Sequence, residues 1–340
     1  MRTPRTRSSL RRMSTITTLA VPTIVPFADE HLPGAGTLLA ARHRAQRAVE
    51  PLLDPAYEQH GRARAEVAAL WEKEGVSGAA AVRDGEVVGF VLGAPRDASW
   101  GPNVWVEPAG HAAAAPELVR DLYAAAAERW VADGRTSHYA IVPATDPALV
   151  DAWFRVGFGH QHVHAIREPW PADAVVEVPP ELTLRGPTRD DIDALARIDV
   201  ALPAHQARSP VFSRLPLPSV EEARAEYEAD FDDPRFATFV VERHGEVIGA
   251  AVGCPIEVSS GHTSLSLPPG AGFLGFAAVL PEHRGHGAGR VLGDAVLAWS
   301  RDEGHPSVVT DWRMTNLLAS RTWPRLGYRP TFFRLFRAIA

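Results

Sequence analysis

The sequence has little of several features that would place it at once in a protein class. Cys254 is its only cysteine, so the chain forms no internal disulfide and no thiolate cluster for zinc, and we expect a reducing, cytoplasmic compartment. Lys73 is its only lysine, and the formal net charge of -6 argues against a general nucleic-acid binder. No apolar run approaches the roughly 18 to 20 residues that cross a bilayer. We therefore expect neither a nucleic acid nor a membrane as partner.

What is present is a globular composition of two-domain length. The chain has 340 residues, 46% hydrophobic and 22% charged, which suits two domains that each bury a core. Residues 1–13 carry several arginines, but no apolar core follows them, so they do not make a secretory signal. We expect them to be a disordered tail, with Met1 and Met13 both candidate starts.

Two stretches of the sequence occur twice, in the same order and at similar separations. Ala81–Pro95 resembles Val241–Pro255, and Trp153–Phe158 resembles Trp323–Tyr328. Two ancestral copies of one domain explain both matches. Because prolines between residues 169 and 180 cannot lie inside helices or central strands, we predict one copy over residues 14–168, a linker over 169–181 and a second copy over 182–340.

The second copy shows a regular alternation of strands and helices. Apolar spacing, helix caps and the turn at His244–Gly245 predict strands over 182–185, 236–242, 247–256, 273–280, 307–312 and 332–339, with helices after Thr188, near Ser219, after Gly287 and over 316–326. This order predicts the α/β (α+β) class, with each copy a mixed, mostly antiparallel sheet flanked by helices.

A glycine-rich turn follows the strand over 273–280 and opens an amphipathic helix. Gly285, Gly287 and Gly289 let the backbone turn sharply, and the first N–H groups of the helix are unpaired at the positive end of its dipole. Such a turn favours a phosphate or pyrophosphate. The glycine spacing is neither that of a dinucleotide fold nor that of a nucleotide-triphosphate loop.

Two motifs together resemble one family. The run Arg284-Gly-His-Gly-Ala-Gly289, preceded by Val279-Leu-Pro, is similar to the acyl-CoA signature of the GNAT superfamily of N-acetyltransferases. Downstream, Asn316, Ala319 and Trp323, then Gly327 and Tyr328, stand in register with that family's second motif. The resemblance covers residues 182–338 directly and residues 16–168 through the internal repeat. It implies two tandem GNAT-type domains.

The resemblance also implies a reaction and its residues. The chain would transfer an acetyl group from acetyl-CoA, a co-substrate, to a primary amine of a small molecule or peptide by direct attack, without a metal. A backbone N–H near Val279 would stabilise the carbonyl oxygen. The implied cofactor-binding residues are Ala277, Val279, Arg284, Gly285, His286, Gly287, Ala288, Gly289, Arg290 and Asn316.

The catalytic residues are less well indicated. Trp323 stands where many members of the family have a tyrosine acid, and an indole N–H is too weak an acid for that role, so Tyr328 and water are the substitutes. For a general base, Asp311 is the first candidate, with Glu242 and His283 behind it. An alternative function is a non-catalytic acyl-CoA sensor or interaction protein that kept the pocket and lost the chemistry.

The first copy departs from the motif. After Val106-Glu-Pro108 it has one glycine and no arginine, and Asp146 replaces the asparagine, so we expect it to bind pyrophosphate poorly and to buttress the second copy. His160, His162 and His164 alternate along a predicted strand. A metal face is one interpretation, but an interface or solvent face is favoured because three positions along one strand are too linear to close a tetrahedral site.

The acceptor amine is not indicated by any motif. We expect the loops over 202–218 and 257–270 to shape its pocket. Tandem acetyltransferases of mycothiol synthesis are one narrower alternative, but no residue identifies an inositol-sugar acceptor. The sequence does not indicate an oligomeric state.

Overall fold

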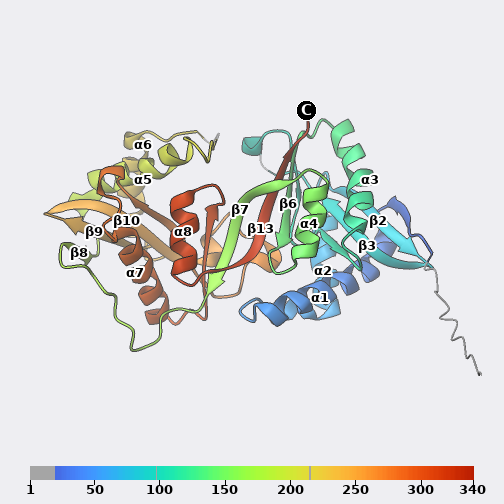
Figure 1. The fold of residues 1–340 in the computed structure, drawn as a ribbon, viewed down its shortest axis with the longest axis horizontal. Coiled ribbons are helices and arrows are strands. Elements are labelled where there is room, and N and C mark those ends of the chain that lie inside the picture. Colours follow the sequence, from blue (N-terminus) through green and yellow to red (C-terminus); the bar gives the residue numbers. More distant parts are fainter. Residues whose placement is uncertain (1–19, 97, 214–215) are drawn as a thin grey trace, which may run out of the picture.

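The computed structural model describes residues 20–96, 98–213 and 216–340. The predicted tail over residues 1–13 lies outside the described residues. Helices flank the sheets along the whole molecule, so the predicted α/β class is confirmed (Figure 1). Among the described residues, no helix combines the length and the apolar composition of a bilayer-spanning segment.

The same order of elements occurs in each half of the chain. The first half contains β1 (Thr23–Pro26), α1 (Leu32–Val49), α2 (His60–Trp71), β2 (Ser77–Arg83), β3 (Glu86–Gly93), β4 (Asn103–Val106), β5 (His111–Ala113), α3 (Leu118–Ala132), β6 (Ser137–Pro143), α4 (Pro147–Arg155) and β7 (Gly159–Arg167). The second contains β8 (Leu182–Arg185), α5 (Ile192–Gln206), α6 (Val220–Asp230), β9 (Ala237–Arg243), β10 (Glu246–Pro255), β11 (Gly272–Val279), α7 (Ala288–Asp302), β12 (Val308–Arg313), α8 (Leu317–Arg325) and β13 (Arg329–Ala338). The first half has two short strands, β4 and β5, where the second has the single strand β11.

The two halves exchange their last strands. The order of the nine-stranded sheet is β4-β6-β13-β7-β12-β11-β10-β9-β8, so β13 lies between β6 and β7. β7 pairs antiparallel with β12 of the second half, and β13 pairs antiparallel with β6 of the first. Figure 1 shows β7 and β13 side by side in the middle of the molecule. The sequence did not predict this continuous sheet, since strand partners far apart in sequence are not encoded in local patterns.

Local sequence signals account for most element boundaries. Ser219 caps α6 and forms a capping box with Glu222, as its N-cap chemistry predicts. His244 and Gly245 both have positive φ angles, 54° and 82°, as a type I′ hairpin turn requires. The predicted apolar face of α7 is buried against β9, β10 and β11, with Leu292 and Val296 fully enclosed.

Two boundaries differ most from the prediction: β13 begins at Arg329 and not at residue 332, and α5 is longer than expected. We expected a loop from Leu202, but α5 continues through Pro203 to Gln206. A proline inside a helix removes one hydrogen bond and is a common stop signal, yet the N–H of Ala207 still donates to the Pro203 carbonyl. The extra turn carries His205 toward the candidate site.

Candidate functional site

The strands β11 and β12 separate partway along their length. They pair in parallel from Gly272 with Val308 to Leu274 with Thr310, where the pairing ends. At that point the Thr310 hydroxyl donates to the Leu274 carbonyl over 3.0 Å. Beyond it, β11 keeps its partner β10 on one side only. The stretch over 275–279 therefore has an open edge facing the gap.

Backbone groups of β11 point into this gap at alternate residues. The N–H of Leu280 donates to the Ile248 carbonyl of β10, and antiparallel register alternates between bonded and non-bonded pairs. Ala277 and Val279 are consequently the residues whose backbone groups face away from β10. The Arg284 Nε donates to the Val279 carbonyl over 3.1 Å. The backbone groups of Ala277 and the N–H of Val279 remain for an extended ligand.

The glycine turn presents amide N–H groups at the start of α7. Gly285 and Gly287 have φ angles of 89° and 84°, which L-residues with side chains rarely adopt, and Gly287 is the N-cap of α7. Within the described chain, no acceptor is found for the N–H groups over residues 285–289. These N–H groups lie at the positive end of a 15-residue helix. The turn has the chemistry of an anion site.

One pocket joins the open edge and the turn. It has a volume of about 370 Å³ and is lined by the β11 edge over 277–279, by residues 283–285 and 287–289, by Asn316, Ala319 and Trp323 of the α8 region, and by Leu202 and His205 of α5. We call it the strand-split pocket. The structure brings eight of the ten predicted cofactor residues to its lining; His286 and Arg290 do not line it. The side chain of Arg290 is instead 3.4 Å from Asp294.

Asn316 has a structural role at the pocket. Its Oδ1 accepts from the N–H groups of Leu318 and Ala319 at 3.2 and 3.4 Å, which makes it the N-cap of α8. The same oxygen lies 3.3 Å from the Nε2 of His205. The sequence reading missed His205 because it placed the residue in a loop; the helical spacing Leu195, Asp199, Leu202, His205 was the available signal.

The two aromatic residues of the second motif lie at different depths. Trp323 lines the strand-split pocket, whereas Tyr328 is 2% exposed and does not. Burial raises the pKa of the Tyr328 hydroxyl well above its usual value. In this structure Tyr328 has neither the access nor the acidity to protonate a leaving group in the pocket.

Asp311 lies on β12, among histidines. Its carboxylate accepts from His162 Nε2 at 2.7 Å, and His262 Nδ1 lies 3.9 Å from its second oxygen. Burial by itself would raise the pKa of Asp311, but the charge and hydrogen bond of His162, with His262 and His164 close by, hold it well below its usual range. Burial lowers the pKa of His162 to about 4. At neutral pH Asp311 is therefore an anion. Such a carboxylate attracts a cation but is a weak base.

The histidines of β7 thus lie where strands of the two halves meet. His162 and His164 lie on β7, between β12 and β13, and His164 is 1% exposed with its ring 4.4 Å from that of His262. No group of three or more side chains suited to hold a metal is found in the described part of the chain.

Acidic and aromatic side chains line two cavities with shared residues, one of which reaches Asp311. A cavity of about 450 Å³ is lined by Asp199 of α5, by Glu226 and Tyr227 of α6, and by Phe236 among others. A second, of about 430 Å³, shares Asp199, Tyr227 and Phe236 with it and reaches Asp311 and the strand segment at Gly275, where β11 has a bulge. We call the two together the acidic pocket. Burial, with Glu226 nearby, raises the pKa of Asp199. No salt bridge to Asp199 or Glu226 is found among the described residues.

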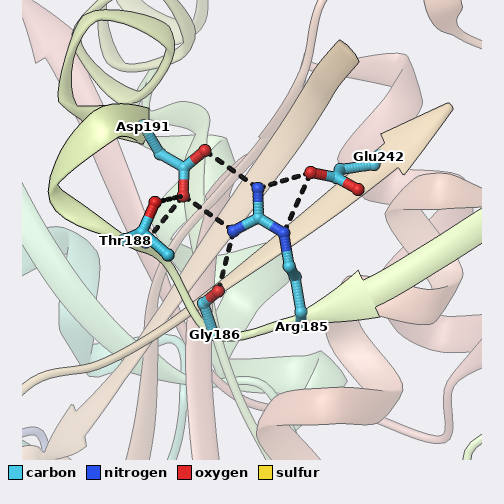
Figure 2. A network of polar contacts seen from close by, with 5 residues as sticks. All are labelled: Arg185, Gly186, Thr188, Asp191 and Glu242. Atoms are coloured by element: carbon cyan, nitrogen blue, oxygen red, sulfur yellow. Dashed lines mark hydrogen bonds and ion pairs between the residues drawn. The ribbon is translucent and has the colours of Figure 1, made fainter. Parts of the chain in front are cut away.

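Residues of α5 line both pockets, and a polar network holds the start of this helix (Figure 2). Arg185 of β8 donates to both oxygens of Asp191 at 2.7 and 2.9 Å, and its Nε donates to Glu242 of β9 at 2.9 Å. Thr188 donates to Asp191 as well. The hydrogen bonds from Arg185 lower the pKa of Asp191 to about 2. Glu242 belongs to this network and lines neither pocket.

His283, the other alternative base, lines the strand-split pocket beside the glycine turn and lies 3.6 Å from Glu246.

The corresponding segment of the first half is folded differently. β5 pairs with β3, and Arg42 of α1 donates to the carbonyls of Pro108 and His111, the first at 2.6 Å. Burial lowers the pKa of Arg42 to about 9. Asp146 caps α4 in the position of Asn316. In the second half this segment has unpaired backbone N–H groups. In the first half its backbone carbonyls instead accept hydrogen bonds from the guanidinium of Arg42.

Comparison with known families adds to the geometry of the strand split and the amide turn. Residues 205–328 match the model of the acetyltransferase (GNAT) family, so the chain contains a domain of that family. Transferases of this family use acetyl-CoA. No curated protein sequence matches the chain.

Solved structures share the fold over nearly the whole chain. A GCN5-related N-acetyltransferase from Sphaerobacter thermophilus is 17% identical, with a TM-score of 0.56 over 92% of this chain and 95% of that one. A fungal multi-domain GH3 β-N-acetylglucosaminidase with a GCN5-related glucosamine N-acetyltransferase region is 15% identical, with a TM-score of 0.51 over 93% of this chain and 38% of that one. A tandem GNAT protein from the clavulanic acid biosynthesis pathway is 19% identical over 93% of this chain and 97% of that one, with a TM-score of 0.47.

Proposed function

We propose that the second half, residues 182–340, transfers an acetyl group from acetyl-CoA to a primary amine, and that residues 14–168 support it without binding the co-substrate. One observation carries the proposal: the open edge of β11 and the unpaired N–H groups over residues 285–289 line one pocket. An extended pantetheine chain needs strand-like partners, and its diphosphate needs N–H donors. The second half offers both and the first half neither.

The residues of this chain would divide the task between the two pockets. The turn over residues 285–289 holds the diphosphate, and the backbone of Ala277 and Val279 aligns the pantetheine chain along β11. The amine approaches from the acidic pocket, where Asp311 and Asp199 attract its cationic form. The amine loses a proton to solvent and attacks the carbonyl carbon in its neutral form. Backbone N–H groups of β11 stabilise the negative charge that develops on the carbonyl oxygen.

The sensor alternative rests on a specific observation. Trp323 cannot donate the proton that a tyrosine donates, and Tyr328 is buried outside the pocket. A protein that binds acyl-CoA without turnover would have the same strand-split pocket.

Calorimetry and an acceptor screen separate these functions. We expect acetyl-CoA to bind with a stoichiometry near one, and thiol release to appear with at least one amine in a panel of polyamines, amino sugars including glucosamine, and peptide N-termini. Glucosamine is included because of the fungal region of similar fold. Binding without release for any acceptor supports the sensor; absence of binding rejects both functions.

A further inference from the structure

The proposed reaction needs a proton donor that the family motif does not provide here. When an amine displaces coenzyme A, the sulfur leaves as a thiolate and must be neutralised. Trp323 lines the strand-split pocket but carries only an indole N–H, and Tyr328 is enclosed behind it. Other side chains of the pocket must therefore be considered.

Two histidines line the strand-split pocket, at different places. His283 precedes the glycine turn on the β11 side, where a bound diphosphate would lie. His205 comes from the last turn of α5 and contacts Asn316, which follows β12 on the other side of the strand split. A chain anchored at the turn and running along β11 from Val279 to Ala277 carries its thioester away from His283. His205 is the histidine left for the reacting end.

The hydrogen bonds of Asn316 fix which atom of His205 carries a proton. Asn316 Oδ1 accepts two backbone N–H groups at the start of α8, so it is an acceptor. The Nε2 of His205, 3.3 Å from that oxygen, is therefore a donor and carries hydrogen. The ring is half-buried, and His205 lines the strand-split pocket next to Asn316.

We propose that His205 is the catalytic acid that protonates the departing thiolate of coenzyme A; this rests on the proposed acetyl transfer. His205 enters the step protonated on both ring nitrogens. The lone pair of the amine forms the new carbon–nitrogen bond, and the carbon–sulfur bond breaks with its electron pair on sulfur. The Nε2 proton leaves Asn316 Oδ1, its acceptor in this structure, and moves to that sulfur. His205 is left neutral with hydrogen on Nδ1. The amine loses one proton to solvent, from which His205 regains one.

The surroundings of His205 favour an anion beside it. The charged residues in the pocket lining are Arg284 and Arg325, and no carboxylate is among the lining residues. The negative charges of bound coenzyme A would offset these cations. A hydrogen-bond donor beside a thiol stabilises the thiolate and so lowers the pH at which the thiol ionises.

This ionisation gives a test that needs no acceptor amine. The far-ultraviolet absorbance of the thiolate is followed against pH for free coenzyme A and for its complexes with the wild-type protein, with His205→Gln and with His283→Gln. We expect the bound thiol to ionise at least about one pH unit lower in the wild type than in His205→Gln, corresponding to about a tenfold change in the equilibrium. For His283→Gln, whose side chain lies beside the glycine turn and away from the thiol, the pH at which the bound thiol ionises should equal that of the wild type.

The result separates this proposal from the proposed function. If coenzyme A does not bind to any form, the acetyl-transfer proposal fails. If it binds and the thiol ionises at the same pH in the wild type and in His205→Gln, His205 is not the acid and acetyl transfer is unaffected.

A wild-type measurement covers the case in which His205→Gln does not fold. Calorimetry in buffers of different ionisation heat compares coenzyme A with its desulfo analogue, which lacks the thiol. At a pH just below that at which free coenzyme A ionises, we expect coenzyme A to release more protons on binding than the analogue does. Equal proton release would overturn the proposal.

Discussion

At Gly289 the backbone itself does not require glycine. A Cβ added there would meet only Val279, at 3.9 Å, and the residue lies in the first turn of α7 without a positive φ. Gly289→Ala should therefore stabilise the helix by roughly 0.5–1 kcal/mol. The new methyl group would nevertheless occupy the strand-split pocket, and we expect acetyl-CoA affinity to fall about tenfold, or about 1.4 kcal/mol. Thermal unfolding and calorimetry on the same sample measure both effects.

Gly61 supplies the matched control for this substitution. It lies in the first turn of α2, is exposed, and has no atom within 4 Å of an added Cβ. Gly61→Ala should give a similar gain in stability with unchanged acetyl-CoA affinity. If Gly289→Ala also leaves the affinity unchanged, no ligand passes close to residue 289.

Among the elements, α5 depends on the ion pairs at its start. The folded-state pKa of Asp191 is about 2, below its ordinary value of 3.8, so the carboxylate contributes stability above pH 4 that is lost as the pH falls toward 2. Because the network is partly exposed to solvent, we expect a loss of about 1 kcal/mol from this residue. Urea unfolding at several pH values should show it in the wild type and not in Asp191→Asn.

Asp190, the exposed neighbour of Asp191, provides the comparison for this acid effect. Asp190→Asn keeps the network of Figure 2 intact, so its pH dependence should follow the wild type. Identical curves for the wild type and Asp191→Asn would mean that the Arg185 network does not stabilise the fold.

For the molecule as a whole, the exchanged strands make each half depend on the other. Residues 182–340 alone would leave β12 without β7, and β13 without both of its neighbours, β6 and β7. Unpaired strand edges are templates for aggregation. We therefore expect residues 182–340 to be insoluble or unfolded when expressed alone, and to fold when residues 1–181 are co-expressed.

A cut in the predicted linker is the control for truncation. Val175 is 85% exposed, so a protease site inserted there should be cleaved in the folded protein. The two fragments should remain together on a sizing column, because β7 and β13 stay paired. A stable, monomeric fragment of residues 182–340 would show that the exchange is not required for folding.

Prediction from sequence succeeded where a property depends on neighbours along the chain. The turn at His244, the cap at Ser219 and the apolar face of α7 follow from residue types at fixed spacing, and the structure has all three. It failed at the end of α5, where packing keeps a helix beyond Pro203. It also gave no indication that Asp311 lies against His162, because that pair joins strands 149 residues apart in sequence.

The amino-acid sequence alone determined the repeat, the order of the elements and the glycine turn, since these depend on local backbone preferences and hydrophobic periodicity. Only the tertiary structure decided that the halves share a sheet, that Tyr328 is enclosed and that His205 reaches Asn316. Each of these depends on which surfaces far apart in the chain bury one another. That outcome is set by the packing of the whole molecule and is not written in any one segment.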